Sequence, residues 1–255
     1  MRETDPNGTW SPAPDSLELG ADQVDVWRIS LDRAIATVKR LESSLSSDEA
    51  QRAVRFHFPA DRDRFIIAHA CLRNILARYL NCQPSQLNFV VNDYGKPALQ
   101  GYNLEFNLSH SGDFALVAVT WERKIGVDVE RIRAEMEFER IAHRFFSPNE
   151  VSELMALPPE QCQSAFFNCW SRKEAYIKAQ GLGLSLSLQS FDVSLTPGEP
   201  ANLRATSLDP NEAARWTLKS LNVDPCYAAA VAVMGENLEF RFWDWNPLTE
   251  RNTIA

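Results

Sequence analysis

The feature that most constrains the fold of this chain is an order of predicted elements that occurs twice. In each half, a β-rich strand precedes two short helical segments, a long helix with an apolar stripe and then further strands. Corresponding elements lie roughly 100 residues apart, with first strands that start at Val24 and Val127 and long helices that start near residues 60 and 161. This steady offset predicts the duplication of one α+β unit.

The individual elements follow from periodicity and turn residues. In the first half we expect strands over residues 24–31, 87–92, 104–108 and 114–121, and helices over 32–45, 47–57 and 60–80. In the second half we expect strands over 125–132, 189–195, 215–222, 226–234 and 238–243, and helices over 135–145, 148–156 and 161–180. The predicted class is therefore α+β, with two similar halves related by a pseudo-twofold axis and an active site in the cleft between them.

The same pattern predicts the domain organisation. Residues 1–20 contain several prolines and no apolar run, so we expect a disordered N-terminus. We expect an N-terminal half over residues 21–122, a C-terminal half over 123–245 and a tail over 246–255. Because a single chain would contain both halves of the site, we expect a monomer.

Composition excludes several classes of protein. The 255 residues carry a formal net charge of −8, which argues against non-specific nucleic-acid binding but allows a local cluster of basic side chains. No run approaches the ~18 apolar residues of a membrane helix, and no signal peptide is visible. The five cysteines include no Cys-x-x-Cys pair, which indicates reduced thiols rather than disulfides or a zinc site. We therefore expect a cytoplasmic protein.

Two carboxylates stand two residues apart in the segment from Gly126 to Glu130. Asp128 and Glu130 would project from the same face of a strand, where they repel each other unless a cation lies between them. Oxygen ligands without a nearby histidine suit Mg²⁺ or Mn²⁺. The alternative is the solvated face of an amphipathic strand, and the motif taken alone favours that alternative.

A second motif runs along the long helix of the second half, from Trp170 to Lys178. Glu174 and Lys178 are four residues apart and share one face of that helix. They border apolar positions, where charged groups need partners other than water, and a metal ion and a phosphate would supply such partners. The alternative is a surface ion pair that contributes ~0.3–0.5 kcal/mol.

A third motif, Phe106 to Gly112, is predicted to end in a loop between two strands. Ser109 and His110 offer a hydroxyl and an imidazole that suit phosphate binding. A hydrolase nucleophile with its base is the competing functional hypothesis, but adjacent residues seldom form a productive pair and the chain has no Gly-x-Ser-x-Gly elbow. A polar hairpin loop without a catalytic role is the remaining alternative.

Further basic side chains offer weaker signals for phosphate binding. Lys96 lies in a Tyr-Gly-Lys-Pro turn, which would present one ammonium group. Arg52 and Arg64 belong to a basic set around the first helices, and guanidinium groups suit phosphate. Most members of that set are expected to face solvent or to pair with aspartates.

Together these motifs resemble the 4′-phosphopantetheinyl transferase superfamily, in particular its long, Sfp-type branch. The resemblance runs from about Arg52 to Phe191 and follows one order along the chain. The matching segments are a basic helix, Tyr-Gly-Lys-Pro, Phe-Asn-x-Ser-His-Ser, Gly-Val-Asp-Val-Glu, Arg-Phe-Phe-Ser, and Trp-Ser-x-Lys-Glu-Ala-x-x-Lys followed by Gly-x-Gly-Leu. Such enzymes have two similar α+β halves, in agreement with the duplication predicted above.

The resemblance implies an activity and its partners. Such enzymes transfer phosphopantetheine from coenzyme A to a serine of an apo acyl or peptidyl carrier protein and release 3′,5′-ADP. The alternative is another Mg²⁺-dependent phosphoryl-transfer enzyme, such as a nucleotide pyrophosphohydrolase. We expect coenzyme A and an apo carrier protein as partners, and neither nucleic acid nor a membrane. The carrier would dock on a small, partly apolar patch near Phe145, Phe146 and the helix over 148–156.

The resemblance also implies roles for individual residues. The implied ligands of Mg²⁺, or of Mn²⁺ in its place, are three carboxylates: Asp128, Glu130 and Glu174. The implied coenzyme A ligands are Lys178 and His110 at the pyrophosphate, Lys96, Ser109 and Arg64 at the nucleotide, and Arg52 at the 3′-phosphate. The residues that would act in catalysis are Glu174, Lys178 and His110. Glu174 is the first candidate for the base that takes the serine proton, directly or through a metal-bound water.

Two further glutamates leave questions open. Glu150 is the second candidate for the base, although an acid at the N-terminus of a helix explains it more simply. Glu49 stands where some relatives carry a lysine for the 3′-phosphate. Either Arg55 compensates for that lysine or the 3′-phosphate is held less tightly.

Overall fold

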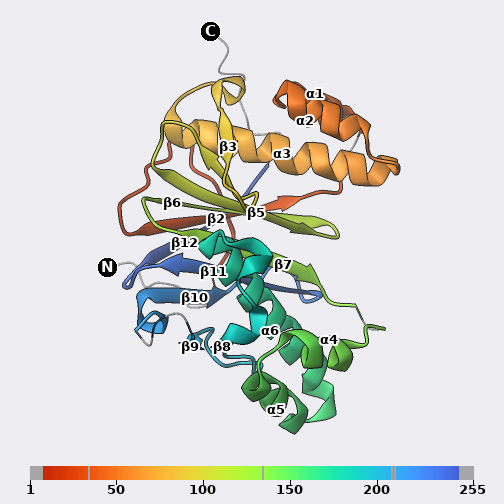
Figure 1. Ribbon diagram of the computed structural model, residues 1–255. Coiled ribbons are helices and arrows are strands. Elements are labelled where there is room, and N and C mark those ends of the chain that lie inside the picture. The colour runs from red at the N-terminus through yellow and green to blue at the C-terminus, as the bar shows by residue number, and fades with distance from the viewer. Residues whose placement is uncertain (1–7, 34, 134, 208, 210, 247–255) are drawn as a thin grey trace.

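The computed structural model describes residues 8–33, 35–133, 135–207, 209 and 211–246. Two β-sheets lie face to face in the middle of the molecule, and helices cover their outer faces (Figure 1). Apolar side chains of both sheets pack between them, among them Val26, Leu116, Val127 and Val231. Two further apolar clusters fill the space between each sheet and its helices. The layers therefore follow the order helix, sheet, sheet, helix.

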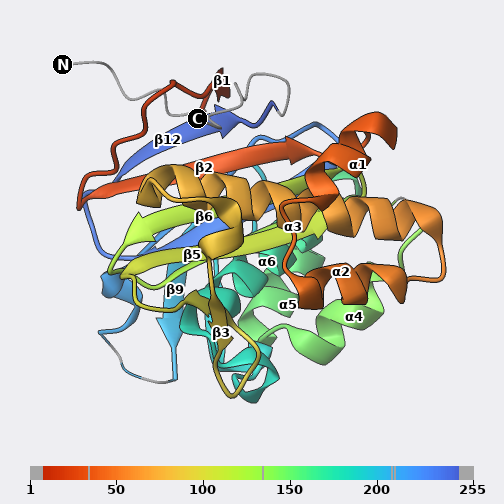
Figure 2. The same ribbon diagram turned by 90° about the horizontal axis from the view of Figure 1, so that it is seen from above.

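The first half supplies one helical layer and the larger sheet. Its helices are α1 (Ile35–Glu42), α2 (Ser47–Val54) and α3 (Pro59–Leu80), with a 3₁₀ turn η1 (Pro84–Gln86) after them. The sheet has the order β1-β12-β2-β6-β5, with β1 (Ser11–Pro12), β12 (Glu239–Asp244), β2 (Gln23–Ser30), β6 (Phe114–Trp121) and β5 (Leu104–Ser111). Strands β3 (Phe89–Val91) and β4 (Pro97–Leu99) form a separate hairpin. Figure 2 shows the helices over one face of the sheet.

The second half repeats this arrangement with a smaller sheet. Its helices are α4 (Phe138–Phe145), α5 (Pro148–Ala156) and α6 (Pro159–Gln180), and its 3₁₀ turns are η2 (Gly183–Ser185), η3 (Leu188–Ser190) and η4 (Ala213–Arg215). The sheet has the order β10-β11-β7, with β10 (Trp216–Ser220), β11 (Tyr227–Met234) and β7 (Ile125–Arg131). Strands β8 (Phe191–Val193) and β9 (Leu203–Thr206) pair as β3 and β4 do. The predicted α+β class is confirmed, and β7-β11-β10 corresponds to β2-β6-β5 in pairing and direction.

The last strand departs from the expected arrangement. The sequence places a strand over residues 238–243 at the end of the second half, but β12 pairs in parallel with β2, inside the sheet of the first half. A buried ion pair favours this position, because Arg241 donates to both carboxylate oxygens of Asp25, which is 0% exposed. After the second sheet, the chain therefore crosses back and adds its last strand to the first sheet.

Part of the N-terminal segment that was expected to be disordered packs on the same sheet. Strand β1 pairs with β12, and the Trp10 ring meets the Phe242 ring edge-on, with 5.5 Å between centroids. Residues 1–7 and residues 247–255 of the predicted tail lie outside the described residues. Across the part of the chain that the structure describes, no helix is long and apolar enough to cross a membrane.

In the first half, an ion pair joins α2 to the long helix α3. Ser46 caps α2 and exchanges hydrogen bonds with Glu49 in a capping box. Glu49 also accepts a hydrogen bond from Arg73 Nε at 2.5 Å, and the Arg73 side chain is 3% exposed. Arg73 donates in addition to the carbonyl oxygens of Pro84 and Leu87, each at 3.0 Å. Charge and hydrogen bonds therefore hold α2 on α3.

The second half contains the same network at a similar offset along the chain. Ser147 caps α5 and forms a capping box with Glu150. Glu150 pairs with Lys173 of α6 at 2.7 Å, and both side chains are almost completely buried. Lys173 donates to the carbonyl oxygens of Leu188 and Phe191 at 2.7 and 2.5 Å. This recurrence supports descent of both halves from one unit.

Candidate active site

The two sheets meet along their edge strands, β5 and β7, through side chains rather than through a backbone ladder. The β5 side chains in this contact occupy alternate positions and are Asn107, Ser109 and Ser111. They accept hydrogen bonds of 2.9, 3.4 and 3.1 Å from the backbone N–H groups of Val127, Val129 and Arg131. For β7, these three side chains take the place of a neighbouring strand. We call this set the β5 zipper.

The β5 zipper corrects the prediction for the motif from Phe106 to Gly112. The sequence predicts a loop from Ser109 onward, but β5 continues to Ser111 and turns at Gly112, whose φ is +57°. Side chains alternate between the two sides of a strand. Ser109 is therefore buried against β7, whereas His110 is exposed.

Helix α6 approaches β7 closely at Gly126. A Cβ atom at this position would lie 2.1 Å from the carbonyl oxygen of Ala175 and 2.3 Å from the backbone nitrogen of Ala179. Because only glycine leaves room for this contact, Gly126 allows the helix to lie directly on the strand. The contact brings Lys178 of α6 to Asp128 of β7, with 2.7 Å between Nζ and Oδ1.

Asp128 is the most buried of the three predicted metal ligands, with 2% of its surface exposed. Its Oδ1 atom accepts hydrogen bonds from Lys178 Nζ and, at 3.1 Å, from Ser109 Oγ. Its Oδ2 atom has no hydrogen-bond partner among the described residues. A buried carboxylate oxygen of this kind is costly unless a cation or a donor meets it. Asp128 Oδ2 is therefore the point where a cation would find an unused ligand.

Glu130 and Glu174 complete an acidic group around Asp128. Glu130 Oε2 accepts a hydrogen bond from Ser111 Oγ at 3.1 Å. Burial raises the pKa of Glu174, the charges of Asp128 and Glu130 raise it further, and Lys178 lowers it. Burial and the charge of Asp128 also raise the pKa of Glu130. The three carboxylates thus repel one another, and Lys178 offsets part of their charge.

The chemistry of this donor set fits a hard divalent cation, because all the donors are carboxylate oxygens. As the side chains lie, however, no group of three or more His, Cys, Asp or Glu residues within the described ranges is close enough to hold a metal ion. The Lys178 ammonium lies beside Asp128 Oδ1. Coordination by all three carboxylates would therefore require side-chain rotations.

Basic side chains gather around His110, next to the carboxylates. The side chain of His110 is exposed at the surface, but the surrounding protein atoms partly desolvate the ring and lower its pKa, and the charges of four basic neighbours lower it further: His69, Lys178, Arg52 and Arg64. These residues come from α2, α3, β5 and α6, so the chain brings them together from both halves. The arginine and lysine side chains of such a group attract phosphate. We call these five residues the cation cluster.

Arg52 and Arg64 are positioned by different contacts. The Arg52 guanidinium lies over the Phe65 ring, 5.2 Å from its centroid. Arg64 donates to Asp113, between β5 and β6, at 3.0 Å. Arg52 is exposed and the Arg64 side chain is 38% exposed, so both can still reach a ligand.

Lys96 has a different environment from the cation cluster. Its Nζ atom donates to the carbonyl oxygens of Ile125 and Ala179 at 3.0 and 3.1 Å. Burial lowers its pKa from 10.5 to about 8. These contacts tie the β3–β4 hairpin of the first half to β7 and α6 of the second.

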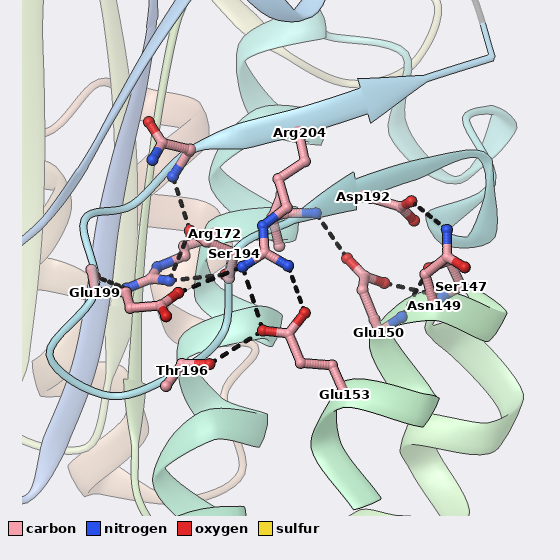
Figure 3. Close-up of polar contacts among 12 residues, drawn as sticks. Ser147, Asn149, Glu150, Glu153, Arg172, Asp192, Ser194, Thr196, Glu199 and Arg204 are labelled. Carbon is pink, nitrogen blue, oxygen red and sulfur yellow. Dashed lines mark hydrogen bonds and ion pairs between the residues drawn. The ribbon is translucent and has the colours of Figure 1, made fainter. Parts of the chain in front are cut away.

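Glu150 does not belong to the candidate site. Its side chain is 1% exposed, pairs with Lys173 and accepts hydrogen bonds from the backbone nitrogens of Ser147 and Val193 at 2.9 and 2.8 Å. Figure 3 shows Glu150 beside polar side chains of α5, α6 and the β8–β9 hairpin. Because both its oxygens are engaged, Glu150 is a structural acid at a helix N-terminus and not a base.

The two phenylalanines of the expected carrier patch differ in exposure. Phe146 is 1% exposed and stacks on Phe166, with 5.2 Å between centroids. Phe145 is partly exposed and meets Trp170 edge-on at 5.9 Å. Because the Phe146 ring belongs to the apolar cluster under α6, only Phe145 of these two side chains could contribute to the expected patch, and the patch itself stays a prediction.

Sequence reasoning missed the roles of three residues that the fold brings to this site. Asn107 and Ser111 belong to the quoted motif, but their contact with β7 was not predicted, and their alternate spacing on a strand was the available signal. His69 joins the cation cluster from within α3, where it follows Phe65 by one helical turn. A lone histidine on a largely apolar helix gives no signal of its own.

Two family models match this chain. The model described as "4′-phosphopantetheinyl transferase superfamily" matches residues 124–232, and the one described as "4′-phosphopantetheinyl transferase, N-terminal" matches residues 32–122. The 4′-phosphopantetheinyl transferase HetI of Nostoc sp. is 43% identical over 241 residues, which cover 93% of this chain and 98% of the relative. The 4′-phosphopantetheinyl transferase Sfp of Bacillus subtilis is 31% identical over 209 residues, which cover 81% and 90%.

Proposed function

This chain belongs to the 4′-phosphopantetheinyl transferase superfamily and is a 4′-phosphopantetheinyl transferase. We propose that it takes the phosphopantetheine group from coenzyme A. The acceptor would be a serine of an apo acyl or peptidyl carrier protein, and 3′,5′-ADP would be released. The observation that carries this proposal is the position of the carboxylates beside the cation cluster, where β5, β7 and α6 meet. Carboxylates that could bind a metal ion and basic side chains that could bind phosphate lie next to each other there.

The proposed site lies in a cleft between two halves related by a pseudo-twofold axis. The matching strand orders and the two capping-box networks support duplication, and the β5 zipper supports a site at the contact between the halves. We expect the halves to correspond to residues 21–122 and 123–245, with β12 returned to the first sheet. We also expect a monomer that works in the cytoplasm without nucleic acid or membrane.

Asp128, Glu130 and Glu174 would hold Mg²⁺, or Mn²⁺ in its place. The unpartnered Oδ2 atom of Asp128 and the mutual repulsion of the three carboxylates support this assignment. The ion would supply positive charge to the pyrophosphate oxygens when it is bound. Ser109 and Ser111 would keep Asp128 and Glu130 oriented through the hydrogen bonds described above.

Four members of the cation cluster would bind the anionic groups of coenzyme A. Lys178 and His110 would lie at the pyrophosphate, Arg64 at the nucleotide and Arg52 at the 3′-phosphate. Ser109 and Lys96 would contribute less directly, because the hydroxyl bonds to Asp128 and the ammonium bonds to backbone carbonyls. Their contribution to the nucleotide stays a prediction.

In the proposed reaction, the carrier serine oxygen attacks the β-phosphorus of coenzyme A. A bond forms between the serine oxygen and phosphorus, and the bond from phosphorus to the bridging oxygen breaks, so that 3′,5′-ADP leaves. Glu174 would accept the serine proton on its carboxylate, and Lys178 and His110 would stabilise charge on the phosphoryl oxygens. Glu150 is no longer a candidate for the base, since it is buried in its own network.

Mass spectrometry tests the proposal. Apo carrier proteins of several classes are incubated with the enzyme, coenzyme A and Mg²⁺, and a gain of ~340 Da on one serine marks transfer of the group. Release of 3′,5′-ADP must depend on the apo carrier, and a carrier whose serine is replaced by alanine is the control. Release without a carrier would instead support the alternative, a nucleotide pyrophosphohydrolase.

A further inference from the structure

Glu49 and His69 form a pair within the cation cluster. His69 Nδ1 lies 3.3 Å from Glu49 Oε1, and the His69 ring packs against Phe65 with 4.1 Å between centroids. Arg52 lies over the same Phe65 ring. Phe65 therefore contacts both Arg52, which is proposed to bind a phosphate, and His69, which has no assigned role.

The state of Glu49 determines which nitrogen of His69 carries a proton. Burial alone would raise the pKa of Glu49, but hydrogen bonds from His69, Ser46 and Arg73, with the charge of Arg73, lower it from 4.5 to about 2. Glu49 is thus ionised at neutral pH and can only accept hydrogen bonds. Nδ1 must therefore be the donor. No hydrogen bond holds Nε2 within the described part of the chain, and the His69 side chain is 22% exposed.

The corresponding network of the second half shows a different arrangement at this position. Cys169 precedes Lys173 by four residues, as His69 precedes the basic residue of α3. Burial raises the pKa of the Cys169 thiol well above its usual value, and the charge of Glu150 adds to the shift. The Glu150 side chain is 1% exposed, whereas that of Glu49 is 15% exposed. In the second half the network is buried away from solvent. In the first half it is partly exposed and lies next to the cation cluster.

We propose that His69, held by Glu49, is a further ligand of the phosphate group that Arg52 receives, and that it binds this group as an imidazolium ion. The ligand class is a phosphate monoester at the end of a nucleotide, which in coenzyme A is the 3′-phosphate. The inference rests on the proposed function. It also answers the question raised by Glu49, because this carboxylate holds an imidazole for the phosphate and its own charge is offset by Arg73.

A bound phosphate would place negative charge beside His69. Glu49 already pairs with this imidazole, and Arg73 pairs with Glu49. Arg52, Arg64 and Lys178 lie with His69 around His110. The negative charges of the phosphate and of Glu49 would together favour the protonated ring. Binding of the 3′-phosphate should therefore draw protons from solution, in part onto His69.

Isothermal titration calorimetry with two ligands tests the inference. Coenzyme A and the same molecule without its 3′-phosphate are compared on the wild type and on His69→Gln, in buffers of different ionisation enthalpy. We expect the preference of the wild type for the 3′-phosphate to fall about tenfold in His69→Gln. The affinity for the shorter ligand should stay within about twofold, and proton uptake with coenzyme A should decrease but not vanish, because His110 remains.

Two further variants distinguish an effect of the charge of His69 from an effect on the structure of the site. His69→Lys supplies a permanent cation, so it should keep most of the preference while its proton uptake falls to the level of His69→Gln. His57→Gln is the matched control, because His57 is exposed and packs on Phe58 outside the cation cluster. It should match the wild type in every measurement.

Three outcomes would overturn the inference. An unchanged preference or unchanged proton uptake in His69→Gln would show that His69 does not meet the phosphate. An equal loss of affinity for both ligands would assign His69 a structural role only. Failure of the wild type to bind either ligand would remove the proposed function itself, and the inference with it.

Discussion

Both halves of the molecule contain a Val-Asp-Val segment in their first strand, and the two aspartates have different environments. Asp25 of β2 is 0% exposed, and both its oxygens are paired, because Arg241 donates to each of them and the Tyr79 hydroxyl donates to Oδ2. Asp128 of β7 is almost as buried, but only Oδ1 is engaged, chiefly by Lys178. Its Oδ2 has no partner among the described residues.

The difference follows from what lies beyond each strand. Strand β2 has β6 on one side and β12 on the other, and β12 supplies Arg241, which pairs with Asp25. Strand β7 has β11 on one side, and along its other edge the β5 zipper accepts the hydrogen bonds of its backbone. The Val-Asp-Val segment of β2 therefore has a structural role, because β12 pairs with that strand. The Val-Asp-Val segment of β7 faces the proposed active site instead.

The largest effect is expected for the two aspartates themselves. Asp128→Ala should reduce pantetheinylation by at least about a thousandfold, because it removes a proposed metal ligand, while the fold persists. Asp25→Ala should leave the activity of the folded protein intact but destabilise it by about 2–4 kcal/mol, because Arg241 and Tyr79 lose their partner. Carrier modification by mass spectrometry and urea unfolding distinguish the two. Full activity of Asp128→Ala would remove the metal assignment.

The buried ion pairs should differ in their contribution to stability. Lys173→Ala leaves Glu150 unpaired in the interior and should cost about 3–5 kcal/mol of unfolding free energy. Arg73→Ala should cost less, about 1–3 kcal/mol, because Glu49 keeps contact with His69 and with solvent. Urea unfolding of both variants measures the difference. Equal losses would contradict the view that only the second network is buried away from solvent.

Glu174 and its counterpart in the first half should differ in catalysis. Glu174→Gln should lower the rate at least about a hundredfold, since an amide neither accepts the serine proton nor binds a metal ion well. Asn74 follows Arg73 as Glu174 follows Lys173, and within the described residues it donates to the Ser44 hydroxyl and to a carbonyl of its own helix. Asn74→Ala should therefore keep the wild-type rate in the carrier assay. A fully active Glu174→Gln would exclude it as the base.

The network of Glu49, His69 and Arg73 in the first half should make the free energy of unfolding depend on pH in the acidic range. The pKa of Glu49 in the folded protein is lowered to about 2 from 4.5, so its stabilising contribution is complete above pH 4.5 and is lost as pH falls toward 2. The contribution is at most about 3 kcal/mol. Unfolding free energies measured at several pH values should fall less steeply over this range in Glu49→Gln than in the wild type. Parallel curves would show that Glu49 is not the group responsible.

The smallest effect concerns the two basic residues at the ends of the long helices. Lys178→Ala should weaken coenzyme A binding about tenfold, because one cation of the cluster is lost. Arg78 occupies the corresponding place on α3 and lies over the Trp27 ring, 5.5 Å from its centroid. Arg78→Ala should leave the dissociation constant unchanged. Calorimetry measures both, and an unchanged constant for Lys178→Ala would contradict its role at the pyrophosphate.

The local sequence predicted much of the fold and of the acidic part of the site. Periodicities of two and of about four residues report which neighbours along the chain share a face, so the long helices and the strand with Asp128 and Glu130 were predictable. The pair Glu174 and Lys178 followed from helical spacing in the same way. The combined order of the motifs then identified the family.

What the sequence determined by itself is the repeated α+β order and the set of groups that a phosphoryl-transfer site needs. The tertiary structure alone decided that β12 joins the first sheet, that Asn107, Ser109 and Ser111 replace a strand for β7, and that Glu49 turns to His69 and Arg73. These contacts join residues that lie about 20 to more than 200 positions apart. A local pattern shows which face of an element is polar, but it does not specify which distant partner that face will meet.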